Sequence, residues 1–183
     1  MKWFIASDIH GSGFYCQKLM KAFECEQADK ILLLGDILYH GPRNDLTQEY
    51  NPKLVADLLN AHKDKIVCVR GNCDAEVDQM VLEFPIMSDY VMLAEGSSTV
   101  FATHGHIYNP ANVPSLYKGD VLLNGHTHIP ACVDYGTFVY MNPGSVSLPK
   151  AESWRGYMIL ENGEFVWKDL DGVIKQTHKL SAE

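Results

Sequence analysis

The sequence lacks several features that would place it in a specialised class of protein. It contains no stretch of about 18 apolar residues, so no membrane-spanning helix is predicted. The apolar run at its start is too short for a secretory signal peptide. Its five cysteines form no Cys-x-x-Cys pair, which favours a reducing compartment over a disulfide framework. We therefore expect a cytoplasmic protein without a membrane association.

Basic residues are also scarce. The chain has 15 Lys and Arg against 23 Asp and Glu, a formal net charge of −8, and no cluster of basic residues. Proteins that follow a phosphate backbone need such a cluster, so a nucleic-acid polymer is not an expected partner. A small phosphorylated compound stays open, because bound cations would supply the local positive charge.

The chain has no internal repeat and no linker rich in proline, glycine or serine. With 183 residues, of which 46% are hydrophobic and 21% charged, its length and composition are those of an ordinary globular domain. We predict one domain over residues 1–183.

Short apolar runs alternate with helical patterns in the first half, which is typical of parallel strands joined by crossover helices. The predicted strands are 2–6, 31–34 and 65–69, and the predicted helices are 14–25 and 52–62. Hairpin signals dominate the second half, at 95–97, 134–136 and Asn162-Gly163. These patterns predict an α/β sandwich of two mixed β-sheets with helices outside.

A polar cluster directly follows each of five apolar runs that predict buried strands. The carboxyl ends of central strands lie along one edge of an α/β sheet, and ligands bind at that edge. Imidazoles, carboxylates and an amide from five segments would therefore meet there, and a pair of divalent metal ions needs such ligands. The clusters are Asp8-x-His10, Gly35-Asp36, Gly71-Asn72-Cys73-Asp74, His104-Gly105-His106 and Gly125-His126-Thr127-His128.

Each cluster has an ordinary explanation when it is taken alone. Asp36 is as consistent with a turn as with a bridging ligand, and Asn72 alone would be read as a turn residue. An isolated histidine is usually a structural residue. The same arrangement at five strand ends is what indicates a metal centre.

The ordered motifs resemble those of the calcineurin-like metallophosphoesterase superfamily, from Asp8 to His128. Asn142-Pro143-Gly144-Ser145 extends the similarity to its small bacterial and archaeal phosphodiesterases. One motif departs from the pattern, because Thr103 replaces the glycine that usually precedes His104. The resemblance implies a four-layer α/β/β/α sandwich and a metal-dependent phosphoric diester hydrolase.

The same resemblance implies the ligands of two divalent metal ions. One ion would bind Asp8, His10, Asp36 and His128, and the other Asp36, Asn72, His104 and His126, with Asp36 as the bridge. Family habit favours Mn²⁺, although Fe, Co²⁺, Ni²⁺ and Zn²⁺ all suit these ligands. The expected reaction is in-line attack on a small phosphate diester by a metal-bridging hydroxide.

Cys73 is the departure with the clearest consequence, because many members of the family have histidine there to assist the leaving oxygen. We expect nearby cations to lower the pKa of this thiol, so that a thiolate repels monoester dianions. Diesters with good leaving groups should then be favoured, and monoesterase activity should be weak. The alternative is that Cys73 only packs beside the site.

Four further residues are candidates for catalysis or substrate binding. Asp74 would orient residue 73 or cap a turn. Arg43 and Asn44 lie on a long loop, 40–52, which is either functional or a solvated insertion. They would contact substrate oxygens, unless Arg43 forms a surface salt bridge. His106 would bind phosphate or form a structural hydrogen bond.

Two other functions compete with the phosphodiesterase. The same fold occurs in a retromer subunit that works as a binding surface, so a non-catalytic scaffold is the main alternative. The chain keeps all seven candidate ligands, which favours an enzyme. A nuclease of the DNA-repair branch is disfavoured by the acidic charge and small size. A homo-oligomer is expected only by analogy.

Overall fold

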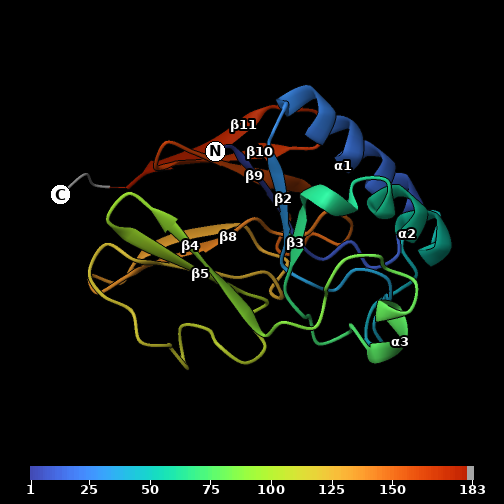
Figure 1. Cartoon of the computed structure of the whole chain (residues 1–183), viewed down its shortest axis with the longest axis horizontal. Coiled ribbons are helices and arrows are strands. Elements are labelled where there is room, and N and C mark those ends of the chain that lie inside the picture. Colours follow the sequence, from blue (N-terminus) through green and yellow to red (C-terminus); the bar gives the residue numbers. More distant parts are fainter. Residues whose placement is uncertain (181–183) are drawn as a thin grey trace.

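The computed structural model describes residues 1–180 and contains two mixed β-sheets packed face to face (Figure 1). The first sheet has the strand order β11-β10-β9-β1-β2-β3, in which β1, β2 and β3 are parallel. Its strands are β1 (Trp3–Ala6), β2 (Lys30–Leu33), β3 (Ile66–Cys68), β9 (Gly156–Glu161), β10 (Glu164–Asp169) and β11 (Ile174–Lys179).

The second sheet has the order β4-β5-β6-β8-β7, with a parallel centre and antiparallel edge strands. Its strands are β4 (Tyr90–Glu95), β5 (Ser98–Thr103), β6 (Val121–Leu123), β7 (Ala131–Asp134) and β8 (Val139–Asn142). The predicted class of fold, with two mixed sheets and hairpins in the second half, is confirmed.

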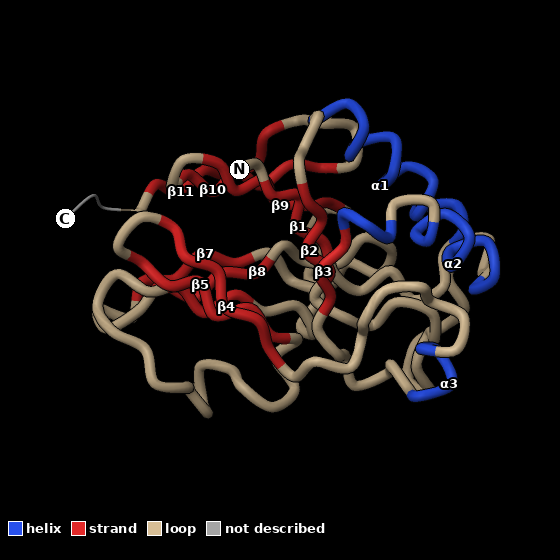
Figure 2. Tube along the Cα trace, viewed as in Figure 1, coloured by secondary structure: helices blue, strands red, loops and turns tan. Residues whose placement is uncertain are grey.

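Two helices, α1 (Gly13–Glu26) and α2 (Pro52–Asn60), pack on the side of the first sheet that faces away from the second (Figure 2). Each begins at a polar side chain that accepts a backbone N–H, which satisfies one free donor of the first turn. Ser12 Oγ accepts from Tyr15 at 3.2 Å, and Asn51 Oδ1 accepts from Leu54 at 3.1 Å. A 3₁₀ helix (Lys63–Lys65) and the one-turn helix α3 (Glu76–Gln79) complete the helical elements of the described residues.

Alternation along the strands divides the apolar residues between two cores. Phe4 and Ile31 contact the helices, whereas their neighbours Ile5 and Leu32 face the second sheet. Trp167 is fully buried between the sheets, where its indole N–H donates to the carbonyl of Asn142 at 2.7 Å. The sheets therefore hold their strand ends in fixed relative positions.

The outer face of the second sheet differs from the expected helical layer. Phe101, Leu122 and Tyr140 project from it and are covered by the loop 104–120, including Tyr108 and Leu116. Within residues 1–180 no helix covers this face. The reason is local, because two prolines and two glycines interrupt the loop at positions 105, 110, 114 and 119.

None of the helices in residues 1–180 combines the length and the apolar character needed to cross a membrane.

Candidate metal centre

The seven predicted ligands come together where five strands end. Asp8 and His10 follow β1, Asp36 follows β2, and Asn72 follows β3. From the second sheet, His104 follows β5, and His126 and His128 follow β6. The strand pattern predicted that these side chains meet at the edge formed by the carboxyl ends of the strands, and the structure brings them together there.

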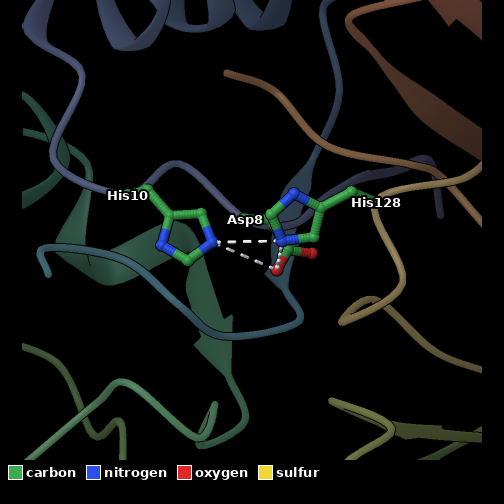
Figure 3. Close-up of side chains that lie close together, drawn as sticks. All are labelled: Asp8, His10 and His128. Carbon is green, nitrogen blue, oxygen red and sulfur yellow. Dashed lines mark hydrogen bonds and ion pairs between the residues drawn. The ribbon is translucent and has the colours of Figure 1, made fainter. Parts of the chain in front are cut away.

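Asp8, His10 and His128 form the first group of ligand atoms (Figure 3). His128 Nε2 lies 3.2 Å from His10 Nε2 and 3.2 Å from Asp8 Oδ1, and His10 Nε2 lies 3.6 Å from the same carboxylate oxygen. All three side chains are almost completely buried. Ligands about 2.1 Å from a shared cation are spaced by about 3.0–3.5 Å, so these separations suit one ion.

His104, His126 and Asn72 form the second group. His104 Nε2 lies 3.0 Å from Asn72 Oδ1 and 3.2 Å from His126 Nδ1. Asn72 is exposed and His126 half-buried, so this group has access to solvent.

Asp36 connects the two groups. Its Oδ2 atom lies 3.6 Å from His10 Nε2 in the first group and 3.4 Å from His104 Nε2 in the second. The other oxygen, Oδ1, accepts the backbone N–H of Cys73 at 2.8 Å. One carboxylate oxygen is therefore fixed, and the other is directed between the two groups.

Backbone carbonyls determine which nitrogen of three histidines is free. The Nδ1 atoms of His10, His104 and His128 donate to the carbonyls of Tyr39, Leu34 and Leu148, at 2.8, 2.6 and 2.7 Å. A carbonyl only accepts, so each neutral ring carries its lone pair on Nε2. This arrangement of partners is typical of metal-binding histidines.

Two observations show that these residues fit a divalent cation. The Nε2 lone pairs of His10 and His128 face each other and would repel without a positive charge between them. Asp8 Oδ1 is buried beside them without a hydrogen-bond donor. A cation would satisfy all three atoms at once.

The electrostatics of the site favour positive charge. Burial alone would raise the pKa of Asp8, but the imidazoles of His10, His128 and His104 beside it hold it well below its ordinary value. Burial opposes protonation of His104, yet Asp36 and Asp8 raise the pKa of its imidazole to about 9. The field that stabilises an imidazolium here would also stabilise a bound metal ion.

Five of the seven ligands have left-handed backbone conformations, which sequence reasoning did not predict. The φ angles are 58° at Asp8, 48° at His10, 56° at Asp36, 65° at His126 and 61° at His128. Such conformations cost on the order of 1 kcal/mol each and persist where the surrounding structure imposes them. The two ligand pairs spaced i and i+2 share this geometry, so each directs two side chains to the same side of the strand ends.

Two glycines allow the strand-end loops to approach the carboxylates. A Cβ atom at Gly71 would lie 2.1 Å from Asp36 Oδ1, and one at Gly125 would lie 2.8 Å from Asp8 Oδ2. Neither contact is sterically tolerable, so both positions require glycine.

Asp74 holds the backbone of the bridging residue. Its carboxylate accepts the N–H groups of Asp36, Ile37 and Gly71 at 2.8, 2.9 and 2.7 Å. Burial raises its pKa, while these hydrogen bonds oppose the shift. The structure therefore favours the turn-capping alternative for Asp74 over an interaction that orients Cys73.

Ser145 and Ser147 hold the backbone of Asp8 in a similar way. Their hydroxyls donate to the Asp8 carbonyl at 2.8 and 3.2 Å. The 142–145 segment thus has a structural role beside the metal ligands.

Cys73 does not have the environment expected for a thiolate. Burial raises the pKa of its thiol to about 12, and the nearby carboxylate of Asp36 adds to the shift. The carboxylates that would hold the cations therefore oppose ionisation of the thiol, and a lowering of its pKa by bound cations stays a prediction. The thiol accepts from Asn72 Nδ2 at 3.3 Å and lies close to Gly41 of the long loop.

A cavity of about 430 Å³ leads to the ligand groups and is lined by both predicted loop residues, Arg43 and Asn44. Asn44 uses its amide nitrogen to donate to the carbonyl of His40 at 2.8 Å, whereas Arg43 is exposed. The structure thus favours the functional alternative for the long loop. His106 is not among the residues that line this cavity, and the centroid of its ring lies 5.4 Å from that of His104.

Sequence reasoning missed two residues of this cavity, Thr127 and Lys150. The backbone N–H of Lys150 donates to the carbonyl of His128 at 3.2 Å, which places its chain beside the site. No motif marks Lys150, whereas the position of Thr127 between two ligands was a usable signal.

The chain belongs to the calcineurin-like phosphoesterase superfamily, because the model of that domain matches residues 1–164. It is therefore an enzyme of the metallophosphoesterase class, a hydrolase that depends on divalent metal ions. The family and enzyme class predicted from the motifs are confirmed.

Individual relatives agree with this assignment. The chain is 44% identical to phosphodiesterase YfcE of Escherichia coli K12 over 162 residues, or 88% of each protein. It matches the structure of YfcE, described as a phosphoesterase, with a TM-score of 0.95 and 41% identity, covering 99% of this chain and 100% of that one. The probable metallophosphoesterase YsnB of Bacillus subtilis is 27% identical over 167 residues, 87% of this chain and 83% of YsnB.

A structure of Vps29 from Entamoeba histolytica covers 99% of this chain and 100% of its own, with a TM-score of 0.63 and 19% identity. At this identity the match shows a shared fold alone.

Proposed function

We propose that this protein is a phosphodiesterase that hydrolyses small phosphate diesters at a dinuclear metal centre, with weak activity toward monoesters. The relationship to phosphodiesterase YfcE supports the diester as substrate. The observation that carries the two-metal proposal is the position of Asp36 Oδ2, within 3.6 Å of a histidine nitrogen in each ligand group.

The first ion would bind Asp8, His10, Asp36 and His128, and the second Asp36, Asn72, His104 and His126. When bound, two such cations would supply an activated water for in-line attack and neutralise the phosphoryl oxygens. Mn²⁺ is the proposed metal, and these oxygen and nitrogen ligands would also accept Fe, Co²⁺, Ni²⁺ or Zn²⁺.

Residues of the chain then position and select the substrate. Asp74 holds the Asp36 turn, so that the bridging oxygen stays directed between the two ligand groups. Arg43 and Lys150 line the cavity as cations and would contact the phosphoryl oxygens that point away from the metals.

Cys73 would set the preference for diesters. A thiol cannot carry positive charge in either protonation state, so it offers no electrostatic attraction to a monoester dianion. A thiol is also a weaker acid than an imidazolium for protonating a poor leaving group. Diesters with stable leaving anions depend least on such assistance.

The direct test compares hydrolysis of bis-p-nitrophenyl phosphate and p-nitrophenyl phosphate by protein stripped with chelator and reloaded with Mn²⁺. We expect diester cleavage that requires the metal and falls at least about a hundredfold in Asp36→Ala. Asp171→Ala, at an exposed turn outside the cavity at the ligand groups, is the control and should keep full activity.

Absence of cleavage with every divalent metal would refute the catalytic proposal and favour the scaffold alternative. Failure to degrade single- and double-stranded DNA under conditions that cleave the diester would exclude the nuclease.

A further inference from the structure

A second and larger cleft opens beside the metal centre. Its volume is about 790 Å³, and its walls include Tyr39, Tyr50, Ala56, Cys73, Val77 and Val81. Cys73 also lines the cavity at the metal ligands, so the two hollows meet at this residue. The size lies within the range of pockets that bind small molecules.

The shared wall is rigidly connected to the metal ligands. The carbonyl of Tyr39 accepts from His10 Nδ1, and the N–H of Cys73 donates to Asp36 Oδ1, both at 2.8 Å. The cleft therefore adjoins the place where the proposed substrate phosphate would bind. No residue of the proposed reaction, apart from Cys73, lies in the cleft.

The lining of the cleft is suited to an apolar group. The Tyr39 and Tyr50 rings each contact the His40 ring edge to face, with centroid distances of 4.8 and 5.2 Å. Val77 and Val81 are 64% and 51% exposed, so an apolar ligand would remove their side chains from water.

The charges around the cleft disfavour an anionic group. Asp57, Asp78 and Glu83 line it, against one cation, Lys53, among the described lining residues. Lys53 is itself paired with Asp57 at 3.0 Å, and Glu83 is paired with Lys63, so that Asp78 is the lining carboxylate without an ion pair among the described residues. A second phosphate or a carboxylate in the cleft would therefore meet net negative charge.

We propose that this cleft binds one ester arm of the substrate, and that the arm is apolar and uncharged, either aromatic or aliphatic. The inference rests on the proposed diesterase function and narrows its substrate class. A diester with a phosphorylated or carboxylated arm is accordingly a poor substrate.

The test measures binding of two diesters with poor leaving groups, diphenyl phosphate and dimethyl phosphate, to Mn²⁺-loaded protein by calorimetry. Both are monoanions with the same phosphate group, and diphenyl phosphate presents a ring to the cleft whichever arm enters it. We expect diphenyl phosphate to bind at least about tenfold more tightly, and bis(4-carboxyphenyl) phosphate to lose most of that advantage.

Val77→Asp and Val81→Asp place a charge in the cleft at exposed positions, so the fold should be preserved. Each should reduce the diphenyl-to-dimethyl preference to within about twofold. Val173→Asp alters a valine of similar exposure (55%) in the β10–β11 turn. This control variant should keep the preference for diphenyl phosphate.

Equal affinity for the two diesters, or an unchanged preference in Val77→Asp and Val81→Asp, would overturn the inference. The binding measurement is independent of turnover. Cleavage of bis-p-nitrophenyl phosphate without the preference for diphenyl phosphate would refute the proposed role of the cleft and retain the phosphodiesterase function. A preference for diphenyl phosphate without cleavage of any diester would refute the phosphodiesterase function and retain the binding of an apolar arm in the cleft.

Discussion

At the scale of single residues, the metal centre combines left-handed backbone at five ligands with histidine rings fixed by carbonyls. Both features are costly or restrictive in the protein alone, because the backbone is strained and lone pairs face each other. A site arranged in this way is organised before a metal binds, and little rearrangement is needed on binding.

Gly71 tests this close fit, because a methyl group there would overlap Asp36 Oδ1 and the backbone nitrogen of Asp36. We expect Gly71→Ala to lower the free energy of unfolding by about 1–3 kcal/mol and to weaken metal binding. Denaturant unfolding and metal titration measure the two effects.

Gly136→Ala is the comparison, since a Cβ at this left-handed glycine meets no atom within 4 Å. Gly136→Ala should lower the free energy of unfolding only by the cost of a left-handed backbone conformation at alanine, about 1–2 kcal/mol. It should leave the metal affinity unchanged. Unaltered metal binding in Gly71→Ala would contradict the close contact.

Cys73 tests the proposed origin of the diester preference. In Cys73→His an imidazole able to carry charge and donate a proton would face the metal centre, so monoester hydrolysis should rise by at least about tenfold relative to diester hydrolysis. The ratio of kcat/KM for p-nitrophenyl phosphate to that for bis-p-nitrophenyl phosphate is the measurement. An unchanged ratio would assign Cys73 a packing role, the alternative to its proposed effect on specificity.

At the scale of elements, the strand ends explain which part of the site was predictable. A ligand that directly follows an apolar strand is recognisable in the sequence, and all seven such residues meet in the structure. Lys150 lies in a loop without a motif, so its place in the cavity depends on tertiary packing that no local pattern encodes. The burial of Cys73 and its proximity to Asp36 could not be predicted for the same reason, because they arise from contacts distant in sequence.

In the fold, too, local sequence patterns predicted some features, whereas others depend on tertiary packing. Apolar runs and helical patterns predicted the strands 2–6, 31–34 and 65–69 and the two long helices to within about two residues, since both depend on neighbouring residues. The cover of the second sheet was mispredicted, because an irregular loop packs there through Tyr108 and Leu116 without any periodic signal.

Glu26, at the end of α1, links that helix to the first sheet. Its carboxylate accepts from Lys168 Nζ at 2.5 Å, from the Tyr157 hydroxyl at 2.8 Å and from Lys2 Nζ at 3.1 Å. Burial opposes ionisation, but these partners lower the pKa of Glu26 below its ordinary value.

Because the folded-state pKa is depressed, the stabilisation is present above the unfolded-state pKa, about 4.3, and is lost as the pH falls through the folded value. We expect Glu26→Gln to be less stable than the parent at pH 7 and to approach it near pH 3. Denaturant unfolding at the two pH values measures this, and a difference that is the same at both would contradict it.

At the scale of the whole molecule, the sandwich places loops from both sheets around one centre. Asp8, Asp36 and Asn72 come from the first sheet, and His104, His126 and His128 from the second. The metal centre therefore depends on how the two sheets pack, and each ion would connect them.

The most direct test of this account is the number of metal ions that each chain binds, together with their positions by anomalous diffraction from Mn²⁺-loaded crystals. We predict two ions per chain in the parent protein, both in contact with Asp36. His128→Ala should lose the ion bound by Asp8 and His10, and Asn72→Ala should weaken the other. A single ion per chain at saturating Mn²⁺, or two ions of which only one contacts Asp36, would contradict the dinuclear centre.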